Sequence, residues 1–387
     1  MEGQPISAVS FPGTADTTRT WEDRQMTGQP IPAVSFQGVT RRYGHVAAVS
    51  DLSLDISPGE FFALLGSSGS GKTTLLMLLA GFEKPTDGRV LMSGKSVSDV
   101  PPHRRRIGVV FQNYALFPHL TAADNVAYPL KMRGVGRSER EERVKAALSL
   151  VNLTDRWASY PSQLSGGQQQ RIALARSLVF GPDLLLMDEP LGALDRRLRD
   201  QMQIELKRIQ GELGITVIYV THDQSEAMAM ADRIGIMAGG RLLQAAAPET
   251  IYAAPSSHFV ARFIGDCSIL RVTSLDGGRA YEIGGARQPL PSSATAPFDI
   301  VVRPENVTLH PVGGAATSDS FGVAATIQEV TYVGAGWRVA LQLADGQSLL
   351  ASVMRGSEMA GSLAPGKPVV ARWASISVAS LPSEGSP

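Results

Sequence analysis

The chain has 387 residues, of which 43% are hydrophobic and 19% charged, so it can bury substantial cores and is not of the disordered class. Lys plus Arg and Asp plus Glu each number 36, and this zero net charge gives no support to a nucleic-acid-coating or polybasic membrane surface. The single cysteine, Cys267, excludes an internal disulfide and favours a reducing compartment. No apolar run approaches the ~20 residues that span a bilayer, so we expect any membrane role to depend on a partner protein.

Residues 1–26 are expected to form a disordered N-terminal extension. The segment GQPISAVSFPG at Gly3–Gly13 recurs as GQPIPAVSFQG at Gly28–Gly38, and only the second copy runs into an organised region. Two copies at so short a period do not make a solenoid, and the acidic start without an apolar core is not a secretory signal. We favour an extension from an early start site over the alternative, an extra edge strand.

Residues 27–245 alternate short apolar strands with helical patterns, which predicts a layered α/β domain. A more helical insertion, at about 113–165, contains the charged amphipathic run RSEREERVKAALSLVNL. The remaining predicted elements are buried strands at 60–66, 106–112, 183–190 and 216–223, with helices at 72–82 and 224–232.

The character of the chain changes after residue 245. Residues 246–265 read as a helical connector broken by Pro255. From 266 to 387, glycine-punctuated β-type runs without helices predict a small all-β barrel of the OB-like kind.

A glycine-rich loop, GSSGSGKTT, lies between a predicted buried strand and a predicted helix. It fits G-x-x-x-x-G-K-[ST], in which glycines let backbone N–H groups turn inward around phosphates and the helix N-terminus adds its dipole. In this pattern Lys72 reaches the β- and γ-phosphates and Thr73 ligates Mg²⁺. A Gly/Ser linker would not occupy such a place. The predicted nucleotide-binding residues of the loop are Gly66, Ser67, Ser68, Gly69, Ser70, Gly71, Lys72, Thr73 and Thr74.

The strand LLLMDEP ends in two acids. Asp188 is predicted to hold the Mg²⁺ shell, as a strand-end aspartate does in this class of site. Glu189, one residue further on, is predicted to polarise the water that attacks the γ-phosphate. By itself, such an acidic pair often only ends a strand in solvent. Because the phosphate loop is also present, we favour the catalytic interpretation.

Gln112 and His222 end two other predicted strands. Ligands of open α/β sheets collect at the carboxyl ends of strands, so both side chains are candidates to face the γ-phosphate. Tyr43, ahead of the core, is a candidate platform for adenine, because stacking needs only a π-face. The alternative for Tyr43 is simple packing on a strand.

A second Ser-Gly-Gly turn, in LSGGQQQR at Leu164–Arg171, opens another predicted helix whose start can bind an anion. It would form a second phosphate cradle, although the first loop suffices for one nucleotide.

These motifs resemble those of the ATP-binding subunit of an ABC transporter. The glycine-rich loop, LSGGQ, LLLMDEP, GALD and VTHD occur in that family's order and near its spacings, and the resemblance runs from about residue 30 to the end. In the family, the LSGGQ loop of one subunit closes over the ATP held by the other. The resemblance therefore implies a P-loop NTPase domain with a helical subdomain, an OB-like domain of the TOBE type, ATP and Mg²⁺ as cofactors, and a homodimer.

The resemblance also assigns roles to single residues. It makes Tyr43 the A-loop, Gln112 the Q-loop, Asp195 the D-loop residue and His222 the switch histidine. It implies the catalytic residues Glu189, His222 and Gln112. It implies the metal-site residues Thr73, Gln112 and Asp188. It implies that the nucleotide of the partner chain is contacted by Ser165, Gly166, Gly167, Gln168 and Asp195.

The resemblance admits three classes of ABC protein: the ATPase subunit of an importer with separate membrane proteins, the ATPase part of an exporter, and a soluble ABC ATPase. An exporter ATPase is usually fused to membrane helices, and a soluble ABC ATPase of repair, chromosome or translation work would typically show heptad arms, tandem cassettes or a basic face. The C-terminal runs FDIVVRPENVTLHP and ATIQEVTYVGAGWRVALQLADGQ instead resemble the regulatory domain of importers of the maltose, ferric-iron and polyamine types. The expected partners are two integral-membrane permease subunits and, indirectly, a periplasmic or extracellular substrate-binding protein, with no nucleic acid.

The segments ARFIGDCSILRV and VTYVG look more like the polyamine or iron branch than the sugar branch. The resemblance therefore predicts spermidine/putrescine import, with ferric iron or another small solute as the alternative. It places the subunit peripherally on the cytoplasmic face of the inner membrane.

Overall fold

The computed structural model describes residues 31–192, 194–276, 280–284, 286–289, 298–312, 321–374 and 378–382. The expected extension at 1–26 lies outside these residues. The chain divides into two compact units, residues 1–248 and 249–387. Within the described residues, no helix is long and apolar enough to cross a membrane.

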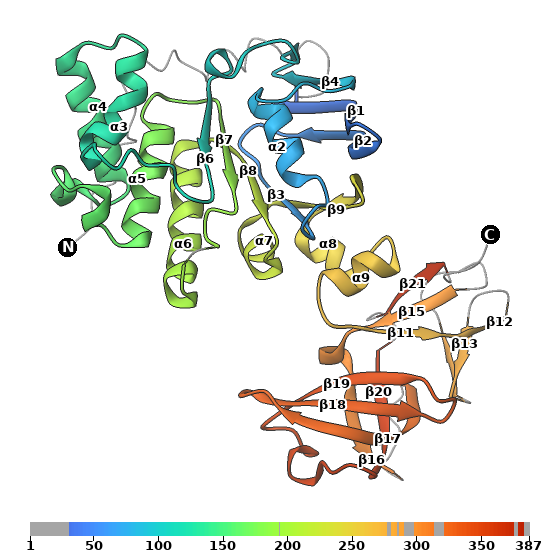
Figure 1. Cartoon of the computed structure of the whole chain (residues 1–387). Helices are drawn as coiled ribbons and strands as arrows, with labels where there is room; N and C mark the ends of the chain where they lie inside the picture. Colours follow the sequence, from blue (N-terminus) through green and yellow to red (C-terminus); the bar gives the residue numbers. More distant parts are fainter. Residues whose placement is uncertain are drawn as a thin grey trace, which may run out of the picture. The chain divides into compact units, whose positions relative to one another are not determined.

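The first unit contains two β-sheets (Figure 1). A mostly parallel sheet has the order β10-β9-β3-β8-β7-β6, with β10 antiparallel to β9. Its strands are β3 (Phe61–Gly66), β6 (Ile107–Val110), β7 (Leu184–Asp188), β8 (Thr216–Thr221), β9 (Arg233–Ala238) and β10 (Arg241–Ala246). An antiparallel sheet has the order β2-β1-β4-β5, formed by β1 (Val34–Tyr43), β2 (Val46–Ile56), β4 (Asp87–Met92) and β5 (Lys95–Ser96).

The parallel strands are apolar along their length because both faces of the sheet are covered. Alternate residues go to different cores: Leu184 and Leu186 of β7 join the core shared with α2 (Lys72–Ala80) and the antiparallel sheet. Leu185 and Met187 join the core on the other face. The helix that follows the glycine-rich loop is thereby fixed between two sheets.

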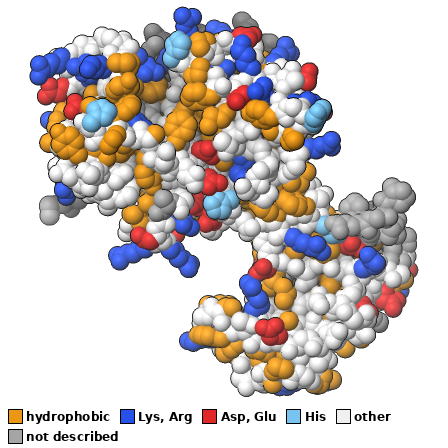
Figure 2. Space-filling model, in the orientation of Figure 1, with side chains coloured by type: hydrophobic (Ala, Val, Ile, Leu, Met, Phe, Trp, Pro, Cys, Tyr) orange, Lys and Arg blue, Asp and Glu red, His pale blue; other side chains and the backbone are white. Residues whose placement is uncertain are grey.

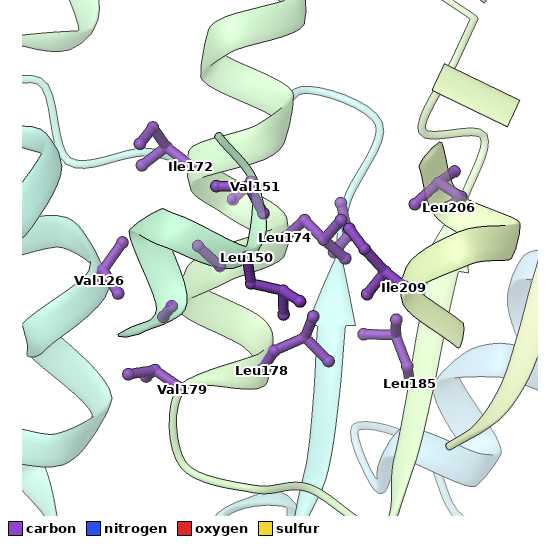
Figure 3. Close-up of a cluster of buried hydrophobic side chains, with 14 of the residues drawn as sticks. Val126, Leu150, Val151, Ile172, Leu174, Leu178, Val179, Leu185, Leu206 and Ile209 are labelled. Carbon is purple, nitrogen blue, oxygen red and sulfur yellow. The ribbon is translucent and has the colours of Figure 1, made fainter. Parts of the chain in front are cut away.

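The second face is covered by helices (Figure 3). In that view Leu174 and Leu178 point toward Ile209 and Leu185, so helices distant in sequence share one core with the sheet. The helices of the first unit beyond α2 are α3 (Ala122–Met132), α4 (Arg137–Leu150), α5 (Gly166–Leu178), α6 (Arg196–Leu213) and α7 (Gln224–Met230). Helices α3 and α4 lie within the insertion expected at about 113–165.

The second unit begins with two short helices, α8 (Pro248–Ala253) and α9 (His258–Phe263), with Pro255 between them. A five-stranded antiparallel sheet of order β16-β20-β17-β18-β19 and two three-stranded sheets, β11-β15-β21 and β12-β13-β14, follow. The all-β, OB-like architecture expected for this part is confirmed. The strands are β11 (Ser268–Arg271), β12 (Thr273–Leu275), β13 (Ala280–Ile283), β14 (Ala286–Pro289), β15 (Phe298–Val302), β16 (Thr308–Pro311), β17 (Phe321–Tyr332), β18 (Gly336–Leu343), β19 (Ser348–Met354), β20 (Pro368–Trp373) and β21 (Val378–Pro382).

Arg303 fastens the two short helices to the sheets of the second unit. Its buried guanidinium donates to the carbonyl oxygens of Ala261, Gly265 and Asp266 at 3.0–3.2 Å, and to that of Tyr252 at 3.0 Å. It also lies 4.0 Å from the centre of the Tyr252 ring.

Candidate nucleotide-binding site

The glycine-rich loop turns from β3 into α2 with no room for side chains at two positions. A Cβ at Gly66 would lie 2.5 Å from the carbonyl oxygen of Met237. Gly71 has φ 101°, and a Cβ there would lie 2.2 Å from the carbonyl oxygen of Ala48. Glycine is therefore required by packing as well as by backbone conformation, and the resulting cradle of backbone N–H groups suits a phosphate.

Lys72 is folded across this loop. Its Nζ donates to the carbonyl oxygens of Gly66 at 2.8 Å and Ser67 at 3.0 Å. Burial lowers the pKa of Lys72, while the carboxylates of Glu189 and Asp188 oppose that shift. The loop therefore holds a cation beside the N-terminus of α2, whose first turn has no acidic residue, and this combination fits the phosphates of a nucleotide.

Asp188 lies at the end of β7, near the side chain of Thr73. The pKa of Asp188 is raised, first by burial and then by the neighbouring Glu189, while Lys72 and Thr73 oppose this shift. A carboxylate and a hydroxyl brought together beside a phosphate cradle are hard oxygen ligands, so this pair fits Mg²⁺.

Glu189 and His222 are in contact, since Nδ1 of His222 lies 3.1 Å from Oε1 of Glu189. The backbone of Glu189 has φ 44°, and its N–H donates to the carbonyl oxygen of Val220 at 2.9 Å. This bond joins the end of β7 to β8 two residues before His222. A non-glycine residue in the left-handed region is strained, and such strain concentrates at functional sites.

Gln112 and Tyr43 are both solvent-exposed. Gln112 follows β6 by two residues. Tyr43 ends β1, and the guanidinium of Arg41, which pairs with Glu83 at 2.6 Å, lies 4.6 Å from the centre of its ring. One face of Tyr43 is thus partly covered by a cation.

The LSGGQ segment forms a capped helix start. Ser165 Oγ accepts from the N–H of Gln168 at 3.4 Å, and Gln168 Oε1 accepts from the N–H of Ser165 at 2.9 Å. The capping box uses the N–H groups of Ser165 and Gln168. Those of Gly166 and Gly167 also lie at this helix start, in the first turn of α5, where backbone N–H groups have no partner within the helix. Asp195 caps the neighbouring helix α6, accepting from the N–H of Leu198 at 2.9 Å.

The predicted residues thus form two groups. Lys72, Thr73, Asp188, Glu189 and His222 are joined by hydrogen bonds or charge, whereas the described hydrogen bonds and ion pairs do not join Ser165, Gly166, Gly167, Gln168 or Asp195 to them. Sequence reasoning missed a third set, Arg199, Asp223 and Glu226, beside the His222 loop. Asp223 could have been found as an N-cap, since an aspartate before an apolar helical run favours that place.

A phosphate cradle at a strand–helix turn, with a strand-end acid pair, defines the nucleotide site of a P-loop NTPase. Residues 49–192 match the family model described as ABC transporter, and residues 300–379 match the model described as TOBE domain. The chain is 48% identical to the spermidine/putrescine import ATP-binding protein PotA of Rubrobacter xylanophilus, over 87% of this chain and 90% of that protein. It is 45% identical to the uncharacterized ABC transporter ATP-binding protein YdcT of Escherichia coli, over 87% and 94%.

Two solved structures are similar to part of this chain. An ATP-binding cassette in a dimeric post-hydrolysis state with ADP and Pi is 36% identical, with a TM-score of 0.50 over 56% of this chain and 98% of that one. The protein cbiO1 from Clostridium perfringens, part of the ABC transporter complex cbiONQ, is 30% identical, with a TM-score of 0.54 over 57% and 91%. The chain belongs to the ATP-binding subunits of ABC transporters, whose ATPase activity is coupled to transport. The family and the fold class that the motifs predicted are confirmed.

Proposed function

We propose that this chain hydrolyses ATP to energise the import of polyamines of the spermidine/putrescine type through separate membrane subunits. The observation that carries the ATPase part is the contact between Glu189 and His222 beside Lys72 and Asp188. The import of polyamines is supported by the names of several relatives at 47–50% identity.

In this proposal the N–H groups of the loop from Gly66 to Thr74 and the Lys72 ammonium bind the phosphates. Thr73, Asp188 and Gln112 would hold Mg²⁺, which when bound supplies charge neutralisation of the phosphate oxygens. Tyr43 stacks on adenine.

The chemical step is assigned to Glu189. Its carboxylate orients a water for in-line attack on the γ-phosphate, and accepts the proton of that water. His222, whose Nδ1 lies 3.1 Å from the carboxylate, holds Glu189 in place beside the γ-phosphate.

A second chain completes the site. Ser165, Gly166, Gly167 and Gln168 present the N-terminus of α5, with the N–H groups of Gly166 and Gly167 in its first turn, and Asp195 lies in the turn beside it. Two chains related by a two-fold axis would bury two nucleotides between such surfaces, so ATP links the pair and hydrolysis releases it.

The surface for the membrane subunits is proposed to lie after Gln112. Asn125 holds this loop, because its Oδ1 accepts from the N–H of Phe117 at 2.8 Å and its Nδ2 donates to the carbonyl oxygens of Phe117, Leu120 and Thr121 at 3.0–3.1 Å. The Phe117 and Tyr128 rings lie 4.6 Å apart, and Tyr128 is 37% exposed. Hydrophobic side chains gather on the visible face of this unit on the side of α3 and α4 (Figure 2), where an apolar element of a partner could bind.

These partners are proposed to be two permease subunits, served by a substrate-binding protein, with this chain peripheral on the cytoplasmic face of the membrane. We further propose that 27–245 is the ATPase domain, 246–265 a connector and 266–387 a regulatory domain.

The test is a reconstituted transporter in which a spermidine-loaded, an iron-loaded and an unloaded binding protein are compared. We expect the spermidine-loaded protein to stimulate ATP hydrolysis and to drive uptake, both lost on Glu189→Gln. If only the iron-loaded binding protein stimulates hydrolysis, the substrate is iron and not a polyamine. A rate of ATP hydrolysis that does not respond to the membrane subunits would support a soluble ABC ATPase.

A further inference from the structure

His222 is held in place through both of its sequence neighbours. Thr221 Oγ1 donates to Glu226 Oε2 at 2.8 Å and accepts from the N–H of Asp223 at 3.0 Å. The Asp223 carboxylate caps α7, accepting from the N–H groups of Ser225 at 2.8 Å and Glu226 at 3.3 Å. The imidazole itself is 62% exposed, so its approach to Glu189 depends on these flanking bonds.

Glu226 is the buried anchor of this loop. Its side chain is 3% exposed, and Oε2 also accepts from the Tyr219 hydroxyl at 2.7 Å. Burial raises the pKa of Glu226, and the nearby Arg199, whose Nε lies 3.6 Å from Oε1, opposes that shift. A buried carboxylate that loses its cation is strongly destabilising, so Arg199 contributes to stability by compensating the charge of Glu226.

Arg199 also has a second set of contacts. Its Nη1 donates to Asp223 Oδ2 at 3.1 Å, and its Nη2 donates to the carbonyl oxygen of Leu194 at 3.1 Å. Leu194 directly precedes Asp195, the residue that caps α6. One rigid guanidinium therefore joins the turn that presents Asp195 to the loop that presents His222. A lysine ammonium supplies the charge but not this fork of donors.

We infer that Arg199 is a positioning residue that makes the alignment of His222 against Glu189 depend on the turn carrying Asp195. A shift of that turn moves the Leu194 carbonyl, and the guanidinium transmits the shift to Asp223 and thus to His222. The inference rests on the proposed function, in which Asp195 faces the partner chain and Glu189 with His222 faces the γ-phosphate. It gives a physical route by which closure of the pair would switch on hydrolysis.

The first test is Arg199→Lys in the full-length chain, with ATP hydrolysis, affinity for ATP and thermal unfolding measured together. Because the counter-charge for Glu226 is kept, we expect the unfolding temperature and ATP affinity to stay near those of the wild type, while kcat falls by about tenfold or more. Arg208→Gln is the matched control, since Arg208 lies on the same helix and its partners, Glu205, Glu212 and the Leu150 carbonyl oxygen, lie outside the His222 loop. It should leave kcat unchanged.

The second test separates positioning from charge compensation. Arg199→Gln leaves Glu226 without its cation and should lower both the unfolding temperature and kcat. Adding Glu226→Gln removes the buried charge, so the unfolding temperature should recover while kcat stays low, because the link to Leu194 is still missing. Recovery of kcat in parallel with stability, or a wild-type kcat in Arg199→Lys, would overturn the inference.

The proposed function is tested separately in the same preparation. If Glu189→Gln hydrolyses ATP at the wild-type rate, the catalytic assignment is wrong whatever Arg199 does. If Glu189→Gln is inactive and Arg199→Lys is fully active, only the positioning role is wrong.

Discussion

Arg176 in α5 donates to the carbonyl oxygen of Tyr114, at 2.8 Å, and also to that of Ala115 at 2.7 Å. Tyr114 and Ala115 have φ of 60° and 46°, a strained turn just after Gln112. The helix that begins at the LSGGQ segment thus holds the turn that leads to the proposed membrane-facing loop.

Arg176→Gln should release this turn. One amide cannot replace two guanidinium bonds, so we expect faster amide hydrogen exchange over residues 112–120 and weaker binding of the membrane subunits. Basal ATP hydrolysis should change less than transport. As a control, Arg137→Gln alters an arginine at the start of α4 and should leave exchange over 112–120 unchanged. Equal exchange rates in Arg176→Gln and the wild type would contradict the prediction.

Glu189→Gln should accumulate an ATP-dependent dimer, because the side chain keeps its size and loses the base. Adding Gly166→Asp should abolish that dimer by placing a carboxylate against the partner's γ-phosphate. A Cβ at Gly166 would lie 3.6 Å from Leu194, an ordinary contact, whereas one at Gly167 would lie 2.9 Å from Leu198, so position 166 disturbs its own chain less. Light scattering with and without ATP measures the outcome.

The control for this experiment is Gly211→Asp in α6, where a Cβ would meet nothing within 4 Å. It adds the same charge away from the proposed interface, and the dimer should persist. If the Gly166→Asp protein dimerises as fully as the Gly211→Asp protein, the LSGGQ segment does not act on the partner's nucleotide.

Glu226 should contribute a defined pH dependence to stability. Burial raises its folded-state pKa above the ordinary 4.5, so the native state retains a proton where the unfolded state has lost it. The contribution of this group is therefore most favourable below pH 4.5 and is lost as the pH rises through the raised pKa. Glu226→Gln removes this dependence.

We expect the unfolding temperature of Glu226→Gln, relative to the wild type, to rise as the pH increases above 4.5. If the difference between the unfolding temperatures of Glu226→Gln and the wild type stays constant with pH, the pKa of Glu226 is not raised by burial.

Arg303→Lys should loosen the two short helices from the sheets of the second unit. Several carbonyl oxygens lose their donor, and a cost of about 3 kcal/mol is expected from unsatisfied buried groups. Hydrogen exchange should accelerate over residues 258–266. The control Arg338→Lys changes an exposed ion pair with Asp266 and should cost less than about 1 kcal/mol. Unchanged hydrogen exchange in Arg303→Lys would contradict the proposed role of Arg303 in holding these helices.

The sequence by itself determined the family, the two kinds of fold and the residues proposed to act on the nucleotide. It could do so because each motif is a short stretch whose chemistry is local: glycines and Lys72 in one loop, Asp188 and Glu189 at one strand end. The apolar runs of β3, β7 and β8 likewise carry their own burial signal, since both faces of that sheet are covered.

Only the tertiary structure decided which of these residues meet. The Glu189–His222 contact arises because β7 and β8 are adjacent, and the spacing of the two residues along the chain does not encode that order. Arg199 and Arg176 gave no sequence signal, since an arginine on a helix is ordinarily a solvated surface residue. Their importance comes from where their guanidinium groups end, beside the Leu194 and Tyr114 carbonyl oxygens, and that depends on the packing of α5 and α6 against the sheet.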